Sequence, residues 1–142
     1  MGQYGFIYQL LFFYIEPVLA LSGAYLTHFE PQTYIHKLVP TAANDPITTA
    51  TQLALTNLAA TYVHFTIVEG LMLRFTNDKM VWRVTVAGMV FSDVLHLWAI
   101  YRARGAVEWD FGRREDWEVF ASSYVPLGLR LAFLAGFDGW TE

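Results

Sequence analysis

The sequence contains no cysteine and few charged residues. Without cysteine, the chain has no disulfide bonds, thiolate metal sites or cysteine nucleophiles. Charged residues make up 15% of the 142 residues, against roughly 25% in soluble domains. The net charge of −4 argues against a nucleic-acid partner, because such a partner requires a basic face. The chain also has no basic stretch before Gly5, so its first apolar run is expected to be retained rather than cleaved as a signal peptide.

What the sequence has instead is four apolar runs of about 20 residues, the length that crosses roughly 30 Å of hydrocarbon. They cover residues 5–29, 51–75, 80–101 and 117–137. None of them has the polar stripe that a soluble amphipathic helix needs. The sequence therefore predicts an all-α fold, a four-helix transmembrane bundle with up-down-up-down topology, as a single domain over residues 1–142. A soluble helical bundle is the alternative.

The segments between the runs are predicted to be loops. Residues 30–50 hold three prolines and few charges, which indicates an irregular connection. Asp45, followed by a proline, is predicted to cap the second helix, and Asn77 or Asp78 the third.

The expected location is a membrane, with the lipid bilayer as partner. We expect a multi-pass protein of the endoplasmic reticulum or another endomembrane. The loops on the side opposite the two termini carry slightly more lysine and arginine than the side with the termini. This distribution favours a cytoplasmic location for those loops and a lumenal or outside location for the termini. The sequence leaves the oligomeric state open.

Every apolar run carries an ionisable residue near its middle, where a charge costs at least about 2.5–3.5 kcal/mol unless it finds a partner or water. These residues are Glu16, His64, Glu69, Asp93, His96 and Arg130. At a rise of 1.5 Å per residue, Glu16, His64 and Asp93 lie about 17–20 Å from the face that holds the N-terminus. On the same scale Glu69 and Arg130 lie about 9–10 Å deep. The sequence therefore predicts a structural ion pair, Glu69–Arg130, and a separate group of four candidate catalytic residues.

Carboxyl and imidazole groups in a low-dielectric site can share a proton near neutral pH, as general acid–base catalysis requires. Glu16 and Asp93 are the expected acid or base, and His64 and His96 the relay. The aromatic and amide side chains expected to hold the substrate are those of Tyr14, Asn57, Tyr62 and Trp98.

This pattern predicts isomerisation or cyclisation of a hydrophobic small molecule, such as a sterol, terpenoid or polyketide-like compound, without a cofactor. A non-catalytic lipid-binding or membrane assembly protein is the alternative. A proton-coupled carrier is a third reading, which four spans could form only as an oligomer.

Two local features bear on this group. Pro17 removes the hydrogen bond to the carbonyl of Phe13, which predicts a kink that opens toward a cavity at Glu16. The spacing of Asp93 and His96 resembles half of a carboxylate–histidine metal site, which Glu16 and His64 could complete. Metal sites in helical bundles usually repeat that unit, so no metal is predicted.

Four stretches carry a resemblance to a known family through their Glu-Pro, Val-Glu, Asp-x-x-His and Leu-Arg elements. They are residues 12–34, 58–78, 81–101 and 126–137. Along nearly its whole length the chain resembles a family of small four-span fungal membrane proteins of unknown function, which implies a fold and a membrane location but no activity. A looser, architectural likeness is to the emopamil-binding-protein class of sterol isomerases, whose members surround a sterol-sized cavity with buried acids and a histidine.

Overall fold

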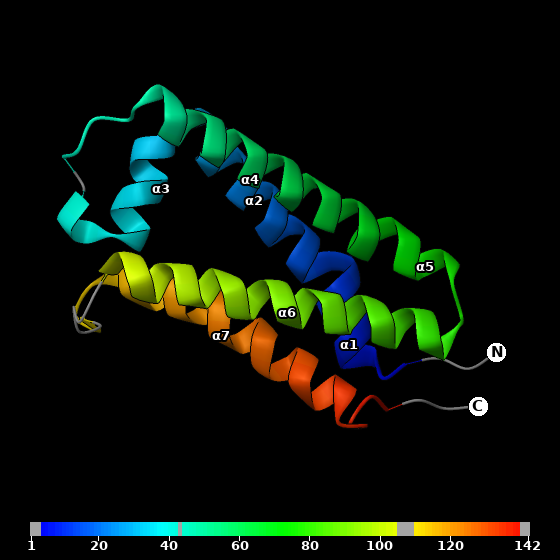
Figure 1. Ribbon diagram of the computed structural model, residues 1–142. Coiled ribbons are helices and arrows are strands. Elements are labelled where there is room, and N and C mark those ends of the chain that lie inside the picture. Colours follow the sequence, from blue (N-terminus) through cyan, green and yellow to red (C-terminus); the bar gives the residue numbers. More distant parts are fainter. Residues whose placement is uncertain (1–3, 43, 105–109, 140–142) are drawn as a thin grey trace.

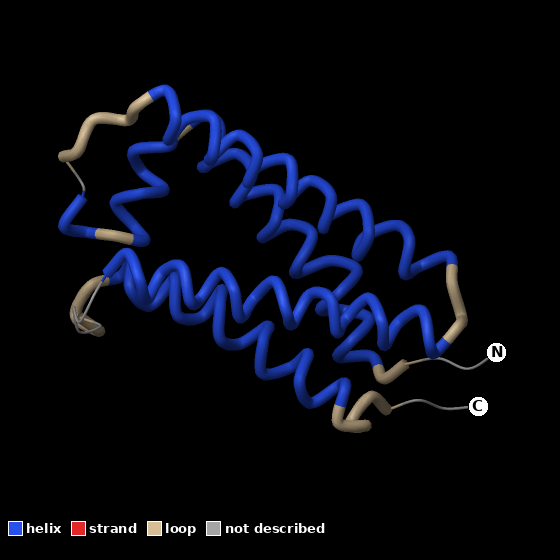
Figure 2. The backbone as a smooth tube through the Cα atoms, in the orientation of Figure 1, coloured by secondary structure: helices blue, strands red, loops and turns tan. Residues whose placement is uncertain are grey.

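A computed structural model of the protein describes residues 4–42, 44–104 and 110–139. Within these residues the secondary structure is helical, with turns and loops between the helices and no strand (Figure 2). The all-α prediction is therefore confirmed for the described part of the chain.

Four long helical segments follow one another, each antiparallel to the one before it (Figure 1). The first two are each interrupted by one π-helical turn, and the last two are single helices. The first segment consists of α1 (Phe6–Leu10), the π-helical turn η1 (Leu11–Ile15) and α2 (Glu16–Phe29). The second consists of α4 (Thr49–Ile67), the π-helical turn η3 (Val68–Met72) and α5 (Leu73–Phe75). The third and fourth are α6 (Lys79–Arg104) and α7 (Arg114–Leu134).

The helix starts show which predicted caps are used. Asp78 caps α6, since its Oδ1 accepts hydrogen bonds from the backbone N–H groups of Met80 and Val81 at 2.7 and 3.3 Å. The prediction of Asp45 as a cap was wrong. Thr48 caps α4 instead, with its hydroxyl accepting from the N–H of Thr51 at 3.1 Å.

The connection predicted to be irregular contains a further helix, α3 (Pro31–Leu38), and a short 3₁₀ turn, η2 (Pro40–Ala42). Pro31 occupies the first turn of α3, where its fixed φ and missing N–H are tolerated. Tyr34 is buried, and its hydroxyl is hydrogen-bonded to that of Tyr62 on α4 at 3.1 Å. This tertiary contact, which the local sequence does not reveal, fixes α3 against the long segments.

Small residues allow the first two segments to pack closely. A Cβ atom placed on Gly23 would lie 3.1 Å from the ring of Tyr62, so the ring occupies space that only glycine leaves free. Farther along, Gly70 lies against the ring of Pro17, which brings the two π-helical turns side by side.

An aromatic cluster joins all four segments near the end of the molecule where the chain starts. Its buried members are Tyr4, Tyr8, Leu11, Phe12, Leu73, Trp82, Val86 and Phe133. The ring of Phe133 meets the rings of Tyr4, Tyr8 and Phe12 at centroid distances of 4.8, 5.3 and 5.8 Å. The cluster fixes one end of the helices, and the polar residues described next lie beyond it.

Among the residues that the structure describes, two helical stretches are long and apolar enough to cross a membrane, Phe6–Phe29 and Lys79–Arg104. Large apolar side chains also lie on the outer surface of all four segments. Val18, Leu53, Phe91 and Val125, one from each segment, are all more than half exposed.

Candidate polar site

The guanidinium group of Arg130 on α7 binds three carboxylates, one from each of the other long segments. Its Nη2 donates to Glu16 Oε2 at 2.7 Å and to Glu69 Oε1 at 2.8 Å. Its Nη1 donates to Asp93 Oδ2 at 2.5 Å. We call these four residues the Arg130 cluster. It ties together the first, second, third and fourth segments at a single point.

The members of the Arg130 cluster differ in exposure. The side chains of Glu16, Glu69 and Arg130 are 4%, 1% and 9% exposed, whereas that of Asp93 is 23% exposed. Any molecule that reaches the cluster from outside would therefore meet Asp93 first.

Glu16 owes its position to the turn that precedes it. Pro17 lacks an N–H group, and the chain before it widens into η1, where the N–H of Glu16 donates to the carbonyl of Leu11. The carbonyl of Phe13, which Pro17 cannot serve, accepts a hydrogen bond from Nη2 of Arg74 at 2.8 Å. The Arg74 side chain therefore satisfies the carbonyl that Pro17 leaves free, and the cavity expected at Glu16 stays a prediction.

Glu69 lies inside the second π-helical turn, η3. Turns of this type are rare and are frequent at functional sites. Because Gly70 in η3 contacts Pro17 in the first turn of α2, directly after η1, the two π-helical turns lie together and direct Glu16 and Glu69 at the same guanidinium group. Neither π-helical turn has a periodic signal in the sequence.

The grouping predicted from depth was therefore wrong in part. The Glu69–Arg130 pair is present, but Glu16 and Asp93 join it instead of forming a separate group with His64. His64 is exposed on the outer face of α4, where its ring contacts Phe65.

His96 follows Asp93 by three residues on α6, so the two residues lie on the same face of that helix. The side chain of His96 is half-buried. Among the described residues, no group of three or more histidine, aspartate or glutamate side chains could hold a metal ion.

The four side chains expected to hold a substrate do not converge. Asn57 and Trp98 are exposed on α4 and α6, and Tyr14 is exposed with its ring under the Arg74 guanidinium at 4.7 Å. Only Tyr62 faces inward, where it bonds to Tyr34. Of these four side chains, Tyr62 alone lies in a position to line an internal site.

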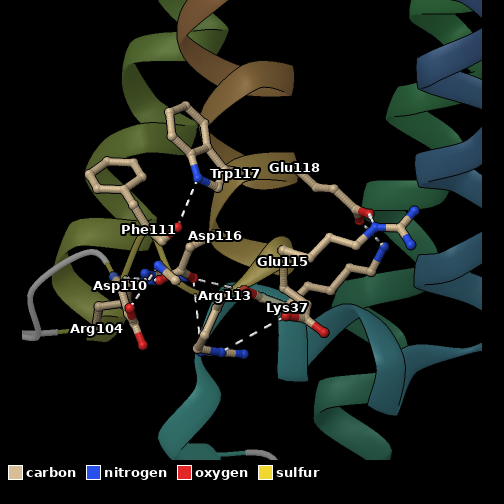
Figure 3. Close-up of polar contacts among 11 residues, drawn as sticks. Lys37, Arg104, Asp110, Phe111, Arg113, Glu115, Asp116, Trp117 and Glu118 are labelled. Atoms are coloured by element: carbon tan, nitrogen blue, oxygen red, sulfur yellow. Dashed lines mark hydrogen bonds and ion pairs between the residues drawn. The ribbon is translucent and has the colours of Figure 1, made fainter.

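A second polar cluster, at the end of the molecule near α3, was missed by sequence reasoning (Figure 3). Arg104, at the end of α6, donates to Asp116 Oδ1 at 2.8 Å and to the carbonyls of Leu38 and Lys37 at 2.5 and 3.2 Å. Asp116 Oδ2 accepts from the N–H of Asp110 at 2.8 Å. The cluster thereby fastens the last turn of α3 to the end of α6 and the start of α7.

Asp116 is almost completely buried. Burial acts to raise the pKa of this carboxyl group, but the hydrogen bonds from Arg104 and Asp110 and the charges of Arg104 and Arg113 outweigh burial and lower the pKa below its ordinary value of 3.8. Alongside it, Glu118 accepts from Lys37 and Arg114, both at 2.8 Å. The only sequence signal for this cluster was the high density of charge in the flanking loop.

Replacing Arg74 with methionine is expected to lower the free energy of unfolding by about 1–2 kcal/mol. The carbonyl of Phe13 would lose its charged donor, and the rings of Phe13 and Tyr14 would lose their contact with the cation. Denaturation of the purified protein measures the change. Arg102→Ala, at an exposed position, serves as the control, and an Arg74→Met variant as stable as the wild type would show that Arg74 does not support η1.

The comparisons with known proteins identify a family but no activity. The family described as "Domain of unknown function (DUF7704)" matches residues 3–140, and the chain therefore belongs to it. No curated protein and no solved structure matches the chain. The fungal origin and the likeness to the emopamil-binding-protein class stay predictions.

Proposed function

We propose that this member of the DUF7704 family is a four-span integral membrane protein that carries out acid–base chemistry on a hydrophobic substrate at the Arg130 cluster. The membrane part of the proposal is supported by the two stretches of sufficient length and apolarity and by the exposed apolar side chains on all four segments. In water such a surface would promote aggregation, whereas in a bilayer it faces lipid. The endomembrane location stays a prediction.

The observation that carries the chemical part is the imbalance of charge around Arg130. Three carboxyl groups face one guanidinium group, so full ionisation would leave two uncompensated negative charges in a buried site. Each uncompensated buried ion costs several kcal/mol. A proton on a carboxyl group removes this cost, and the cluster is therefore suited to hold exchangeable protons.

One buried oxygen points to where such a proton would lie. Oε1 of Glu16 is buried and accepts no hydrogen bond from any described residue. Its other oxygen, Oε2, and Oε1 of Glu69 both bind Nη2 of Arg130, at 2.7 and 2.8 Å, so the two carboxyl groups lie side by side. We place the stored proton between Glu16 and Glu69, and the exchanging proton on Asp93, which is the most exposed member.

In the proposed reaction, the carboxyl group of Asp93 donates its proton to one carbon of a substrate double bond. A carboxylate of the same cluster then removes a proton from a neighbouring carbon, so that the double bond moves and the number of protons in the cluster is restored. Arg130 would limit the negative charge of the cluster throughout the reaction. His96, half-buried on the same face of α6 as Asp93, would orient the substrate. The substrate would enter from the lipid, which requires it to be apolar.

The test is replacement of Asp93 with asparagine, which keeps size and a hydrogen-bond acceptor but cannot exchange a proton. We expect a membrane extract from cells carrying Asp93→Asn to resemble that from cells lacking the protein, with one lipid-soluble precursor accumulated and its isomer absent. Mass spectrometry of extracts from strains with equal protein levels measures the change. Leu95→Ala, an exposed position on the same helix, should retain the wild-type profile.

A wild-type lipid profile in the Asp93→Asn strain would refute the catalytic proposal and favour a second function, a non-catalytic lipid-binding or membrane assembly protein. One observation favours that alternative. Every hydrogen bond found for the Arg130 side chain goes to a carboxylate from another segment. An ion-pair cluster whose role is only to hold the helices together would have the same arrangement. On that reading the same substitutions would reduce the amount of folded protein rather than turnover.

A further inference from the structure

Tyr34 and Tyr62 bring two phenolic hydroxyl groups together inside the molecule. Tyr34 on α3 is buried, Tyr62 on α4 is half-buried, and their hydroxyl oxygens lie 3.1 Å apart. Each tyrosine hydroxyl carries one proton and can both donate and accept a hydrogen bond. The bond between the two residues uses one of the two protons. Within the part of the chain that the structure describes, the other proton has no acceptor.

The burial of the two side chains indicates which hydroxyl keeps the second proton. Tyr34 is 7% exposed, so protein encloses its hydroxyl, and an enclosed donor without an acceptor is unfavourable. The favourable arrangement is therefore that Tyr34 donates to the oxygen of Tyr62. The remaining donor is then the hydroxyl of Tyr62, whose side chain is only half-buried.

The position of the Tyr62 hydroxyl is fixed from two sides. The ring occupies the space that Gly23 of α2 leaves free, because a Cβ atom at Gly23 would lie 3.1 Å from the ring. The hydrogen bond from Tyr34 holds the oxygen itself. A donor fixed in this way loses little conformational freedom when it binds a ligand, which favours binding.

Tyr62 also lies on the same face of its helix as the nearest member of the Arg130 cluster. It precedes Glu69 by seven residues. At 3.6 residues per turn this places the two side chains within about 20° around the helix and about 10 Å apart along it. Asp93 on α6 interacts electrostatically with Tyr62. The free hydroxyl and the proposed proton donor therefore belong to one interior region.

The chemistry of the free hydroxyl selects the group that it binds. A tyrosine O–H group donates to an oxygen atom and gains nothing from a hydrocarbon chain. A buried water molecule needs two to four polar partners, whereas the carbonyl or hydroxyl oxygen of a hydrophobic molecule can be held by this single donor.

We propose that the substrate of the Arg130 cluster, whose catalytic role this inference assumes, is an oxygenated hydrophobic molecule. Its carbonyl or hydroxyl oxygen accepts a hydrogen bond from Tyr62, about 10 Å from the double bond that Asp93 protonates. Tyr62 is a binding residue. Tyr34 is a positioning residue, because its own proton occupies the Tyr62 oxygen and turns the Tyr62 proton toward the substrate.

The compound that accumulates in the Asp93→Asn strain gives the first test. Its accurate mass should show at least one oxygen atom. A compound of carbon and hydrogen alone would overturn this inference and leave the catalytic proposal intact. A wild-type lipid profile in that strain would instead refute the catalytic proposal, and the inference about its substrate with it.

The second test measures turnover of that same compound by the purified protein in detergent. Tyr62→Phe should raise KM about five- to tenfold with little change in kcat, because the lost hydrogen bond holds substrate and transition state alike. Tyr34→Phe breaks the same bond between the tyrosines but keeps the Tyr62 hydroxyl, so its KM should rise no more than about twofold. Tyr25→Phe, at an exposed tyrosine of α2, should match the wild type.

Two results of this assay would overturn the inference. Equal increases in KM for Tyr34→Phe and Tyr62→Phe would mean that the tyrosine pair only fixes α3. An unchanged KM for Tyr62→Phe would mean that its hydroxyl does not bind the substrate.

A change on the substrate covers the case in which Tyr62→Phe does not fold. The analogue of the accumulated compound in which hydrogen replaces the oxygen function should show a KM for the wild-type protein raised by about the same five- to tenfold factor. Equal KM values for the compound and its analogue would contradict the inference.

Discussion

The variant Arg130→Met is expected to lose about 3–5 kcal/mol of stability, a large part of the roughly 5–15 kcal/mol that holds a typical domain folded. Removing one partner of a buried ion pair leaves the other charge uncompensated, and here three carboxyl groups lose their common partner at once. Each carboxyl group comes from a different segment, so the substitution removes ion pairs that connect all four helical segments. Denaturation of the purified protein in detergent, followed by helical content, measures the change. Arg102→Met, at an exposed arginine on α6, should shift stability by no more than about 0.5 kcal/mol.

A combined variant separates charge from packing in this result. Adding Glu16→Gln, Glu69→Gln and Asp93→Asn to Arg130→Met removes the uncompensated charges, and we expect much of the lost stability to return. If the fourfold variant is no more stable than Arg130→Met alone, the cluster acts through side-chain packing instead. Arg130→Met with wild-type stability would show that the three carboxyl groups are neutral without arginine.

The four helical segments could be predicted because their signal is local. Runs of apolar residues interrupted by proline and charged residues place the second segment at residues 51–75 and the third at 80–101, and the structure gives Thr49–Phe75 and Lys79–Arg104. The helix α3 could not be predicted in the same way. Its eight residues are stabilised by Tyr34, whose partner Tyr62 lies 28 residues away in the chain.

The chemistry of the candidate site was visible in the sequence, but its grouping was not. The sequence analysis assigned Glu69 and His64 to different groups, and they do lie apart, since Glu69 is buried and His64 is exposed. Depth failed because a rise per residue locates the backbone and leaves out the reach of the side chains. The long side chains of Glu16, Glu69 and Arg130 meet at one guanidinium group although their backbone positions were expected at different depths. A proline directly after Glu16 was the one clue to the π-helical turn η1.

The replacement Arg104→Met is expected to be nearly as damaging as the loss of Arg130, at about 3–5 kcal/mol. Arg104 neutralises the buried carboxylate of Asp116 and also serves the last two carbonyl groups of α3. Without it, α3 should separate from α7 while the aromatic cluster at the other end stays packed. Hydrogen exchange should therefore accelerate in α3 more than around Phe133. Equal acceleration at both ends would mean that the bundle unfolds as one unit.

Lowering the pH should reproduce part of the stability loss expected for Arg104→Met, because it protonates Asp116. Because the pKa of this carboxyl group is lower in the folded protein than its ordinary value of 3.8, its ionisation contributes stability that is fully present above about pH 5 and is lost as the pH falls below 3.8. The variant Asp116→Asn should lack this contribution. It should be less stable than the wild type at neutral pH, and the difference should narrow as the pH falls toward 2. Carboxyl groups elsewhere titrate in both proteins, so the comparison isolates Asp116. A difference in stability that stays constant from pH 7 to pH 2 would mean that Asp116 holds α3 and α7 through hydrogen-bond geometry rather than through charge.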